Sequence, residues 1–122
     1  LGNDVTRDKE GVSIAPLVRG EDIPNRAIYW HFPHYSNHGM QSPGGAIREG
    51  DYKLLDYFEN GTVQLFNLRT DIGEQNDLAA SLPAKAKSLS RKLRAWRKRV
   101  SAQMMKPNPD FDASKYPWAE GK

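Results

Sequence analysis

The stretch "GAIREGDYKLLDYFENGTVQLFNL", residues 45–68, decides the fold of this chain. It contains three short runs of apolar and β-prone residues, separated by Gly50-Asp51 and by Asn60-Gly61. Runs of this kind bounded by turn formers are typical of antiparallel strands, and an Asn-Gly pair favours a type I′ hairpin turn. The stretch therefore predicts two consecutive hairpins. Their strands are expected at about 46–48, 52–58 and 63–68.

One more strand is predicted upstream of these hairpins. The segment "RAIYWHF", residues 26–32, is rich in β-branched and aromatic residues and ends before Pro33, which cannot donate to a sheet ladder. Residues 1–25 are interrupted by glycine and proline and predict an irregular lead-in, with one helical turn near 14–18. Because consecutive strands with short connections usually pair, the economical topology is a meander of three or four antiparallel strands.

A single long helix is predicted after the last strand. Its apolar residues fall at positions 82, 86, 89, 93, 96 and 100, a spacing of alternating fours and threes that forms one stripe. Ser81 is a suitable N-cap, and Pro83 suits the first turn. The predicted fold class is α+β: a small antiparallel sheet with one long C-terminal amphipathic helix, residues 82–103, packed across one face. Pro107 and Pro109 are expected to end the helix, and 107–122 form an irregular tail.

Length and composition limit the functions open to this chain. Its 122 residues suffice for one modest core, and the absence of cysteine excludes disulfides, thiolate metal sites and cysteine nucleophiles. No apolar run approaches the roughly 20 residues that cross a bilayer, so no membrane contact is predicted. The chain begins with Leu1 and has no signal-peptide pattern, from which we expect a piece of something longer.

Charge is distributed unevenly along the chain, although the net value is only +3. Residues 1–82 hold 7 Lys/Arg and 12 Asp/Glu, whereas residues 83–106 hold 9 Lys/Arg and no acid. A nucleic-acid groove is one interpretation of this basic helix. The other is a solvated face whose cations partly compensate the charge of the acidic residues in the sheet. The second is favoured, because the helix carries no aromatic stacking platform. The cations concerned are Lys85, Lys87, Arg91, Lys92, Arg94, Arg97, Lys98 and Arg99.

The segment "YWHFPHYSNHG", residues 29–39, gathers three histidines among aromatic rings. A metal site, an ordinary structural role and contact with a ligand are the three interpretations. Strand alternation would direct His31 and His34 to opposite faces, and no acidic residue lies between Asp22 and Glu49, so a metal is disfavoured. Ligand contact is favoured, since imidazoles beside aromatic rings bind sugar hydroxyls and anions well. No G-x-S-x-G elbow or phosphate-binding glycine loop offers an alternative site.

Three motifs together resemble a known family. The segment "EGVSIAPLVRG", 10–20, resembles the "DGxSLxPLLxG" segment that precedes the C-terminal subdomain of type I sulfatases. The segment "AIREGDYKLL", 46–55, resembles their "AxRxGxYKxI" hairpin, and "VQLFNLRTDIGEQNDLA", 63–79, resembles "ELYDLxxDPxExxNLA". Ile72 departs from the pattern, where the family usually has proline. Their order and spacing over roughly residues 10–100 indicate the C-terminal subdomain of a formylglycine-dependent sulfatase or arylsulfatase.

The resemblance implies a division of labour within a longer protein. In this family a preceding catalytic domain carries a C-x-P/A-x-R motif, whose cysteine or serine becomes the formylglycine that attacks the sulfate ester. Acidic residues there bind a divalent cation, usually calcium, which polarises the sulfate. This chain has no cysteine and no S-x-P/A-x-R string, so neither catalytic residues nor a metal site are expected in it. The implied organisation is a lead-in at 1–25 from the missing catalytic domain, the subdomain at 26–106, and the tail.

The resemblance also implies a role in substrate recognition. The family's subdomain packs on the catalytic domain and contributes to the pocket wall that holds the leaving alcohol of a sulfated carbohydrate or aryl sulfate. By hypothesis His31 and His34 contact sugar hydroxyls or an anionic group, with Tyr35, His38 and Arg48 as further candidates; for Arg48 a structural role in the hairpin motif is favoured. The parent protein is expected to be periplasmic or secreted.

Two other functions stay open on the sequence. One is a free-standing basic module that binds anionic polysaccharide or nucleic acid through its helix, and the other is a purely structural cap. A subdomain separated from its catalytic domain should expose an apolar patch, whereas a free module should not.

Overall fold

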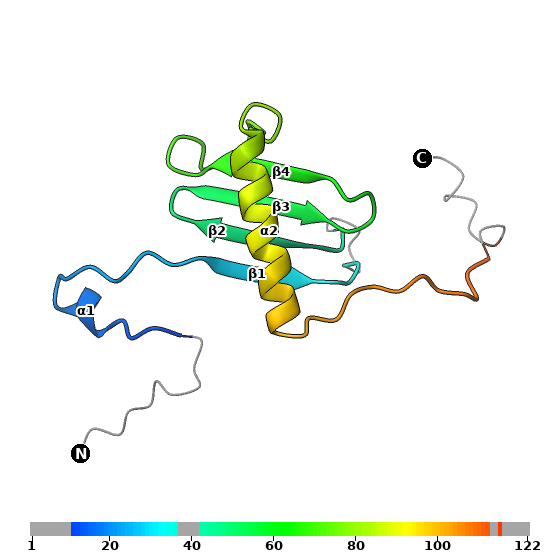
Figure 1. Cartoon of the computed structure of the whole chain (residues 1–122), viewed down its shortest axis with the longest axis horizontal. Helices are drawn as coiled ribbons and strands as arrows, with labels where there is room; N and C mark the ends of the chain where they lie inside the picture. Colours follow the sequence, from blue (N-terminus) through cyan, green and yellow to red (C-terminus); the bar gives the residue numbers. More distant parts are fainter. Residues whose placement is uncertain (1–10, 37–41, 113–114, 116–122) are drawn as a thin grey trace, which may run out of the picture.

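The computed structural model describes residues 11–36, 42–112 and 115. It confirms the α+β class and the meander, because the sheet is antiparallel with strand order β1-β2-β3-β4 (Figure 1). One long helix, α2, lies across one face of this sheet. The elements are α1 (Ala15–Val18), β1 (Ile28–Phe32), β2 (Gly44–Glu49), β3 (Tyr52–Tyr57), β4 (Val63–Asn67) and α2 (Pro83–Arg99).

The strand register assigns every sheet residue to one of two faces. Ile47 in β2 lies opposite Tyr29 in β1 and Leu54 in β3, and all three point toward α2. Since side chains alternate along a strand, the neighbouring residues Ala46 and Leu55 point away from the helix. We call the first side the helix face and the second the outer face.

The core lies between the helix face and α2. Leu54, Leu65 and Leu93 have no measurable exposure, and they pack with Ile47, Ala86 and Leu89. The ring of Trp96 stacks on that of Tyr29, with centroids 4.9 Å apart and planes 5° from parallel. The predicted stripe is therefore confirmed in its central part. Its end members, Leu82 and Val100, are about 37% and 38% exposed, because each flanks the helix.

The two hairpin connections differ in form. Gly50-Asp51 joins β2 to β3 as predicted, with Gly50 at φ 60°. The type I′ turn predicted at Asn60-Gly61 is wrong, because only the glycine takes a positive φ, of 67°. Tyr57 N–H donates to the Thr62 carbonyl at 3.0 Å, which closes a longer loop over 58–61. Within it the Asn60 side chain accepts a hydrogen bond from the Thr62 N–H at 3.0 Å.

Both ends of the long helix differ from the sequence prediction. Leu82, not Ser81, occupies the N-cap position, and no side chain caps the helix there; Ser81 Oγ instead donates to the Leu78 carbonyl at 3.2 Å. The helix ends at Arg99 rather than near residue 103. The reason is Ser101, whose φ of 52° reverses the chain so that the Ala102 N–H donates to the Arg97 carbonyl at 2.9 Å.

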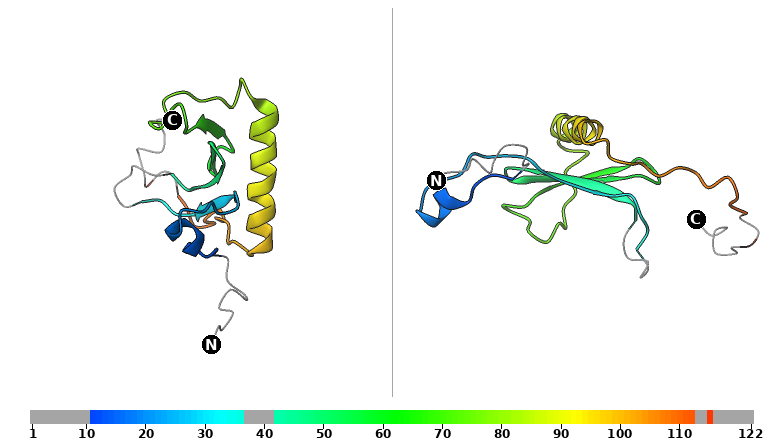
Figure 2. Two further views of the ribbon diagram at one scale, coloured as in Figure 1. Left: turned by 90° about the vertical axis from the view of Figure 1, so that its left-hand side faces the viewer. Right: turned by 90° about the horizontal axis from the view of Figure 1, so that it is seen from below.

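The connection from β4 to α2 crosses the outer face before it reaches the helix (Figure 2). It also pairs with β4, because the Leu65 N–H donates to Asp77 Oδ1 at 2.9 Å and the Leu78 N–H donates to the Leu65 carbonyl at 2.7 Å. Phe66 on the outer face is only 3% exposed. The connection thus closes the β4 edge and covers one side of the outer face.

Candidate functional site

His31 lies on the helix face of β1, at the end of the sheet where α2 finishes. Its Nε2 is 2.7 Å from the carbonyl oxygen of Gln103, so the ring donates to the chain that leaves the helix. The imidazole also contacts the Phe58 ring, with centroids 5.5 Å apart. Its Nδ1 is buried and has no hydrogen-bond partner among the described residues. These contacts hold His31 between the sheet and the C-terminal segment.

His34 and Tyr35 lie beyond the end of β1 and are exposed. The His34 ring meets the Phe32 ring edge-on, with centroids 5.6 Å apart. Tyr35 is 63% exposed, and its hydroxyl donates to Glu59 Oε1 at 2.8 Å; this hydrogen bond raises the pKa of Tyr35. The contacts fasten the start of the loop to the sheet while both polar tips stay accessible. The third histidine, His38, lies outside the described residues.

Arg48 lies on the outer face, away from His34 and Tyr35, although His31 also borders the groove beside it. It pairs in register with Ile28, whereas Phe32, at the loop end of β1, pairs with Gly44. Four residues of strand therefore separate Arg48 from the loop, roughly 13 Å. Arg48 borders a groove of about 530 Å³ whose other lining includes Trp30, Lys53 and Leu55. His34 and Tyr35 are thus sequence neighbours beyond the end of β1, while the His31 ring lies on the helix face and Arg48 on the outer face.

A buried ion pair, which the sequence analysis missed, lies beneath the C-terminal end of α2. Arg97 Nη1 is 2.6 Å from Asp56 Oδ2, and each residue is only 8% exposed. The guanidinium also lies 4.6 Å from the centroid of the Phe58 ring. Gly45 makes room for it, since a Cβ there would collide with Arg97 Nη2. The prediction that Arg97 is solvated is wrong, because its position four residues after Leu93 puts it on the apolar stripe.

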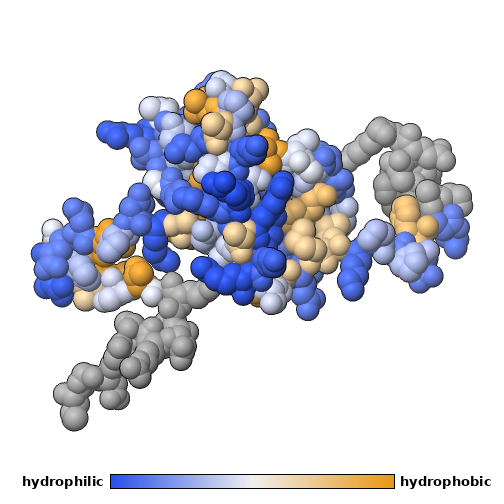
Figure 3. Space-filling view, in the orientation of Figure 1, coloured by the Kyte–Doolittle hydropathy of each residue, from blue (hydrophilic) through white to orange (hydrophobic). Residues whose placement is uncertain are grey.

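Other cations of α2 follow the prediction more closely. Lys92 Nζ is 2.6 Å from Glu49 Oε1, and Lys85 Nζ lies 4.8 Å from the centroid of the Tyr52 ring. Lys92 therefore pairs with an acidic residue of the sheet, as predicted, whereas the contact of Lys85 with an aromatic ring was not predicted. The outward side of α2 is strongly hydrophilic (Figure 3). Its exposed cations include Lys87, Arg91, Arg94 and Lys98.

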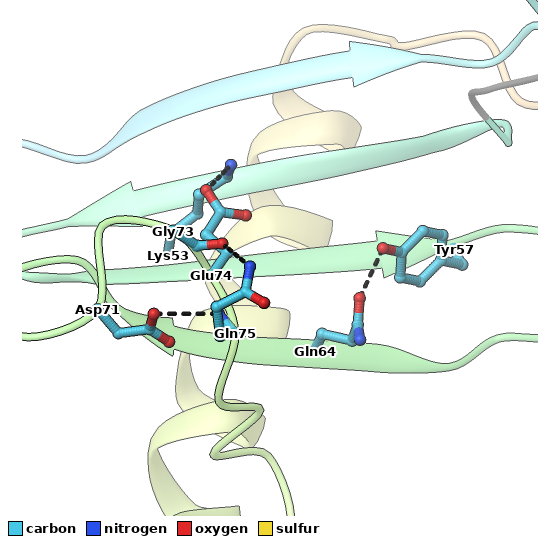
Figure 4. A network of polar contacts seen from close by, with 7 residues as sticks. All are labelled: Lys53, Tyr57, Gln64, Asp71, Gly73, Glu74 and Gln75. Atoms are coloured by element: carbon cyan, nitrogen blue, oxygen red, sulfur yellow. Dashed lines mark hydrogen bonds and ion pairs between the residues drawn. The ribbon is translucent and has the colours of Figure 1, made fainter.

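A network of polar contacts fastens the β4–α2 connection to the outer face (Figure 4). Lys53 Nζ is 2.6 Å from Glu74 Oε1, which holds the connection against β3. Beside them the Tyr57 hydroxyl donates to Gln64 Oε1 at 2.7 Å. Burial, with the charges of Glu74 and Asp77, raises the pKa of Tyr57. The network has a structural role, since its hydrogen-bonding groups are used within the chain.

A second part of this network shapes the connection itself. The Asp71 carboxylate accepts hydrogen bonds from the backbone N–H groups of Gln75 and Asn76, at 3.0 and 2.8 Å. These bonds lower the pKa of Asp71. Glu74 takes a φ of 55° at the tip, a conformation that L-residues adopt at a cost. The segment that resembles the sulfatase "DPxExxN" pattern is therefore an ordered turn, and the hydrogen bonds that the Asp71 carboxylate accepts stabilise it.

Comparison with known proteins accounts for this combination of sheet, connection and helix. The family model for N-sulphoglucosamine sulphohydrolase, C-terminal, matches residues 2–103. The chain belongs to this family. The match favours a sulfatase C-terminal subdomain over a free-standing basic module.

Two curated relatives of the subdomain are themselves sulfatases. A sulfatase from Formosa agariphila is 34% identical over 109 residues, which cover 79% of this chain and 20% of the relative. A Delta 4,5-hexuronate-2-O-sulfatase from Bacteroides thetaiotaomicron is 32% identical over 82 residues, 64% of this chain and 16% of the relative. The chain therefore spans about a fifth of the length of the curated relatives it matches.

Solved sulfatase structures contain the same fold. A 2-O GAG sulfatase is similar with a TM-score of 0.65 and 25% identity, over 90% of this chain and 24% of that one. A putative sulfatase from Bacteroides thetaiotaomicron has a TM-score of 0.58 at 24% identity, over 86% of this chain and 24% of that one. The second likeness concerns the fold alone.

The sulfatase subdomain does not offer the groups that formylglycine and its metal need. The sequence has no cysteine to convert, and the described residues contain no group of three or more His, Asp or Glu that could hold a metal ion. No catalytic step is therefore assigned to the described residues. In the described part of the chain, no helix is long and apolar enough to span a membrane.

Proposed function

We propose that this subdomain completes a sulfatase, a sulfuric ester hydrolase, by packing on its catalytic domain and forming part of the substrate pocket. The carrying observation is the family match over residues 2–103, together with relatives that are all sulfatases. The catalytic domain supplies the formylglycine nucleophile and a calcium ion, while the subdomain alone releases no sulfate. Export to the periplasm or the medium follows from the same proposal, because polymeric sulfated substrates are met outside the cell.

The proposed substrate class is a sulfated carbohydrate rather than an aryl sulfate. One curated relative is a hexuronate-2-O-sulfatase, and one structural neighbour is a 2-O GAG sulfatase. A further neighbour was solved with D-glucosamine-2-N,6-O-disulfate, at a TM-score of 0.61 and 24% identity, over 78% of this chain and 21% of that one. Exposed imidazole and phenol groups suit such a ligand, because both can hydrogen-bond to sugar hydroxyls and to sulfate oxygens.

His34 and Tyr35 are the residues we assign to the pocket wall. The His34 ring contacts Phe32, the Tyr35 hydroxyl donates to Glu59, and both residues are exposed at the start of the loop. His31 is assigned to positioning, since its Nε2 already donates to the Gln103 carbonyl. His38 belongs to the same loop in sequence and is carried as a further candidate. Arg48 is a structural residue of the hairpin in this proposal.

The test uses single substitutions in the full-length enzyme with a sulfated disaccharide as substrate. His34→Ala should raise KM by roughly tenfold or more, since a hydrogen bond to a charged group contributes about 1.5–3 kcal/mol. Tyr35→Phe should have a smaller effect in the same direction. Arg94→Ala is the matched control, because Arg94 is exposed on α2, outside the loop that carries His34 and Tyr35.

Substitutions of the two histidines distinguish the positioning role assigned to His31 from the substrate contact assigned to His34. His31→Ala should lower the stability of the enzyme more than it changes KM, whereas His34→Ala should do the reverse. Unchanged KM and kcat in both histidine variants would remove both residues from the substrate site. A full-length protein that releases no sulfate from any sulfated saccharide would reject the enzyme assignment itself.

A further inference from the structure

The outer face of the sheet carries exposed apolar side chains on β1, beside the exposed cation Arg48, where the chain's own connection does not cover it. An antiparallel sheet with a solvated face normally carries polar residues on that face. Here Trp30 is 48% exposed and Phe32 is 40% exposed, and two grooves of about 260 and 530 Å³ adjoin them. We call this area the open face. It consists of Ile28, Trp30, Phe32, Ala46 and Leu55.

The chain covers the other part of the same face. The ion pair of Lys53 with Glu74 holds the β4–α2 connection over β3, and Phe66 is buried to 3% exposure. No described segment extends this cover to β1, which is the strand with the largest apolar side chains on that side. Contiguous exposed apolar area on a soluble domain marks an interaction surface.

The lead-in shows the same lack of cover. The helix α1 buries none of its residues, and its Leu17 and Val18 are 50% and 82% exposed. A helix of four residues has too few hydrogen bonds to be stable in water by itself, so packing must support it. The lead-in runs directly into β1, and α1 lies beyond the start of that strand (Figure 1). Two neighbouring elements thus present apolar side chains that this chain leaves unburied.

The opposite side of the molecule is unsuited to the same use. The outward side of α2 carries cations such as Arg91, Arg94 and Lys98, and the helix contains no acidic residue. Burying several like charges without partners carries a large desolvation penalty. A partner that covers apolar surface therefore meets the open face rather than the helix.

We infer that the open face and α1 together form the docking surface for the catalytic domain of the parent sulfatase. This inference rests on the proposed function. The occupant follows from length: the matched segment is only 20% and 16% of two curated relatives, so about four to five times its own length of protein accompanies it there. Within one polypeptide such a domain is always present at high effective concentration. Trp30 is the central anchor, because large aromatic side chains dominate the energy of such contacts.

The experiment places a photoreactive benzoylphenylalanine in the full-length protein at position 30 or, as matched control, at position 94. After irradiation and digestion, position 30 should cross-link to peptides of the catalytic domain and position 94 should not. The substitution at 30 replaces one aromatic ring with another, which preserves local packing. In addition, Leu55→Arg should lower the Tm of the full-length protein by several degrees, whereas Arg94→Glu should not.

Each other occupant gives a distinct result. Cross-links from position 30 only to a second copy of the protein would overturn the inference in favour of a dimer face. Cross-links only to an added sulfated oligosaccharide would overturn it in favour of a sugar platform. Cross-links to the catalytic domain without any sulfatase activity would keep the docking face and reject the proposed function. Sulfatase activity without those cross-links would do the opposite.

Discussion

Leu54 and Leu55 are neighbours in β3, yet they belong to surfaces of different kinds. Leu54 is fully buried between the sheet and α2, while Leu55 borders the grooves of the open face. The helix face is covered within the chain, since every strand contributes a residue to a core that α2 closes. Among the described residues, the outer face is covered only beside β4. One face of the sheet therefore stabilises this domain, whereas the other leaves apolar side chains such as Trp30 exposed among the described residues.

The ion pairs of the two faces differ in the same way. Arg97 and Asp56 lie within the helix face with side chains about 9% and 10% exposed, whereas Lys53 and Glu74 on the outer face are 26% and 29% exposed. A buried pair is expensive to break because the remaining charge stays without a partner, while a half-exposed pair is partly screened by water. Substitutions on the two faces should therefore have unequal costs.

The largest effect is expected from Arg97→Ala on the helix face. It leaves the Asp56 carboxylate buried and unpaired, which should lower the free energy of unfolding by about 3–5 kcal/mol. Urea unfolding of the 122-residue chain measures this change. The double variant Asp56→Leu with Arg97→Met should regain much of the loss, since no charge then stays buried.

A control for charge itself is Lys92→Met. Its pair with Glu49 is 43% and 33% exposed at the side chains, so the loss should be less than about 1 kcal/mol. Equal losses for Arg97→Ala and Lys92→Met would show that burial does not distinguish the two pairs.

The two leucines test the faces directly. Leu54→Ala should lower the free energy of unfolding of the chain by about 2–5 kcal/mol, because it leaves a cavity in the core. Leu55→Ala should cost about 1 kcal/mol or less, since its side chain is already partly in water. In the full-length protein the gap should narrow, as the docked domain would bury Leu55. A gap that stays the same there would contradict docking on the open face.

Sequence pattern predicted the helix face well, because periodicity reports burial within the chain. The stripe through Ala86, Leu89 and Leu93 identified the helix side of the core without any structure. The same stripe includes position 97, yet the charge of Arg97 pointed to solvent. Its partner Asp56 is distant in sequence, so no local signal showed that the charge would be neutralised.

The outer face and the candidate site were less predictable. The run Ile28–Phe32 alternates, with the apolar Ile28, Trp30 and Phe32 on one side and the ring residues Tyr29 and His31 on the other, so an apolar outer side of this strand could have been found from the sequence. The histidine spacing did not show that His31 would be used by Gln103, because that contact depends on where α2 ends. The helix ends there because Ser101 takes a left-handed backbone conformation, which a serine in the sequence does not predict.

A smaller effect on the outer face is expected from Asp71, and it should depend on pH. Hydrogen bonds from Gln75 and Asn76 lower its pKa in the folded chain, so its contribution to stability is present above the ordinary pKa of aspartate. That contribution is lost as the pH falls through the lowered value. Asp71→Asn should therefore destabilise the chain at neutral pH and much less in acid. Urea unfolding across pH checks this.

The matched control for this pH dependence is Asp110→Asn, in the exposed segment after α2. It should shift stability little at any pH. A difference between Asp71→Asn and the parent chain that persists unchanged in acid would mean that the carboxylate charge does not organise the connection.

The smallest effect is expected where the helix face ends. Ser101 holds a φ of 52°, which strains an L-residue but not glycine, so Ser101→Gly removes strain while it adds freedom to the unfolded chain. These terms oppose each other, and the net gain should be a few tenths to about 1 kcal/mol in urea unfolding. Ser101→Val should instead destabilise, since a β-branched residue tolerates positive φ poorly. If glycine and valine had the same effect, the helix would not depend on this residue to stop, and the position of Gln103 against His31 would need another cause.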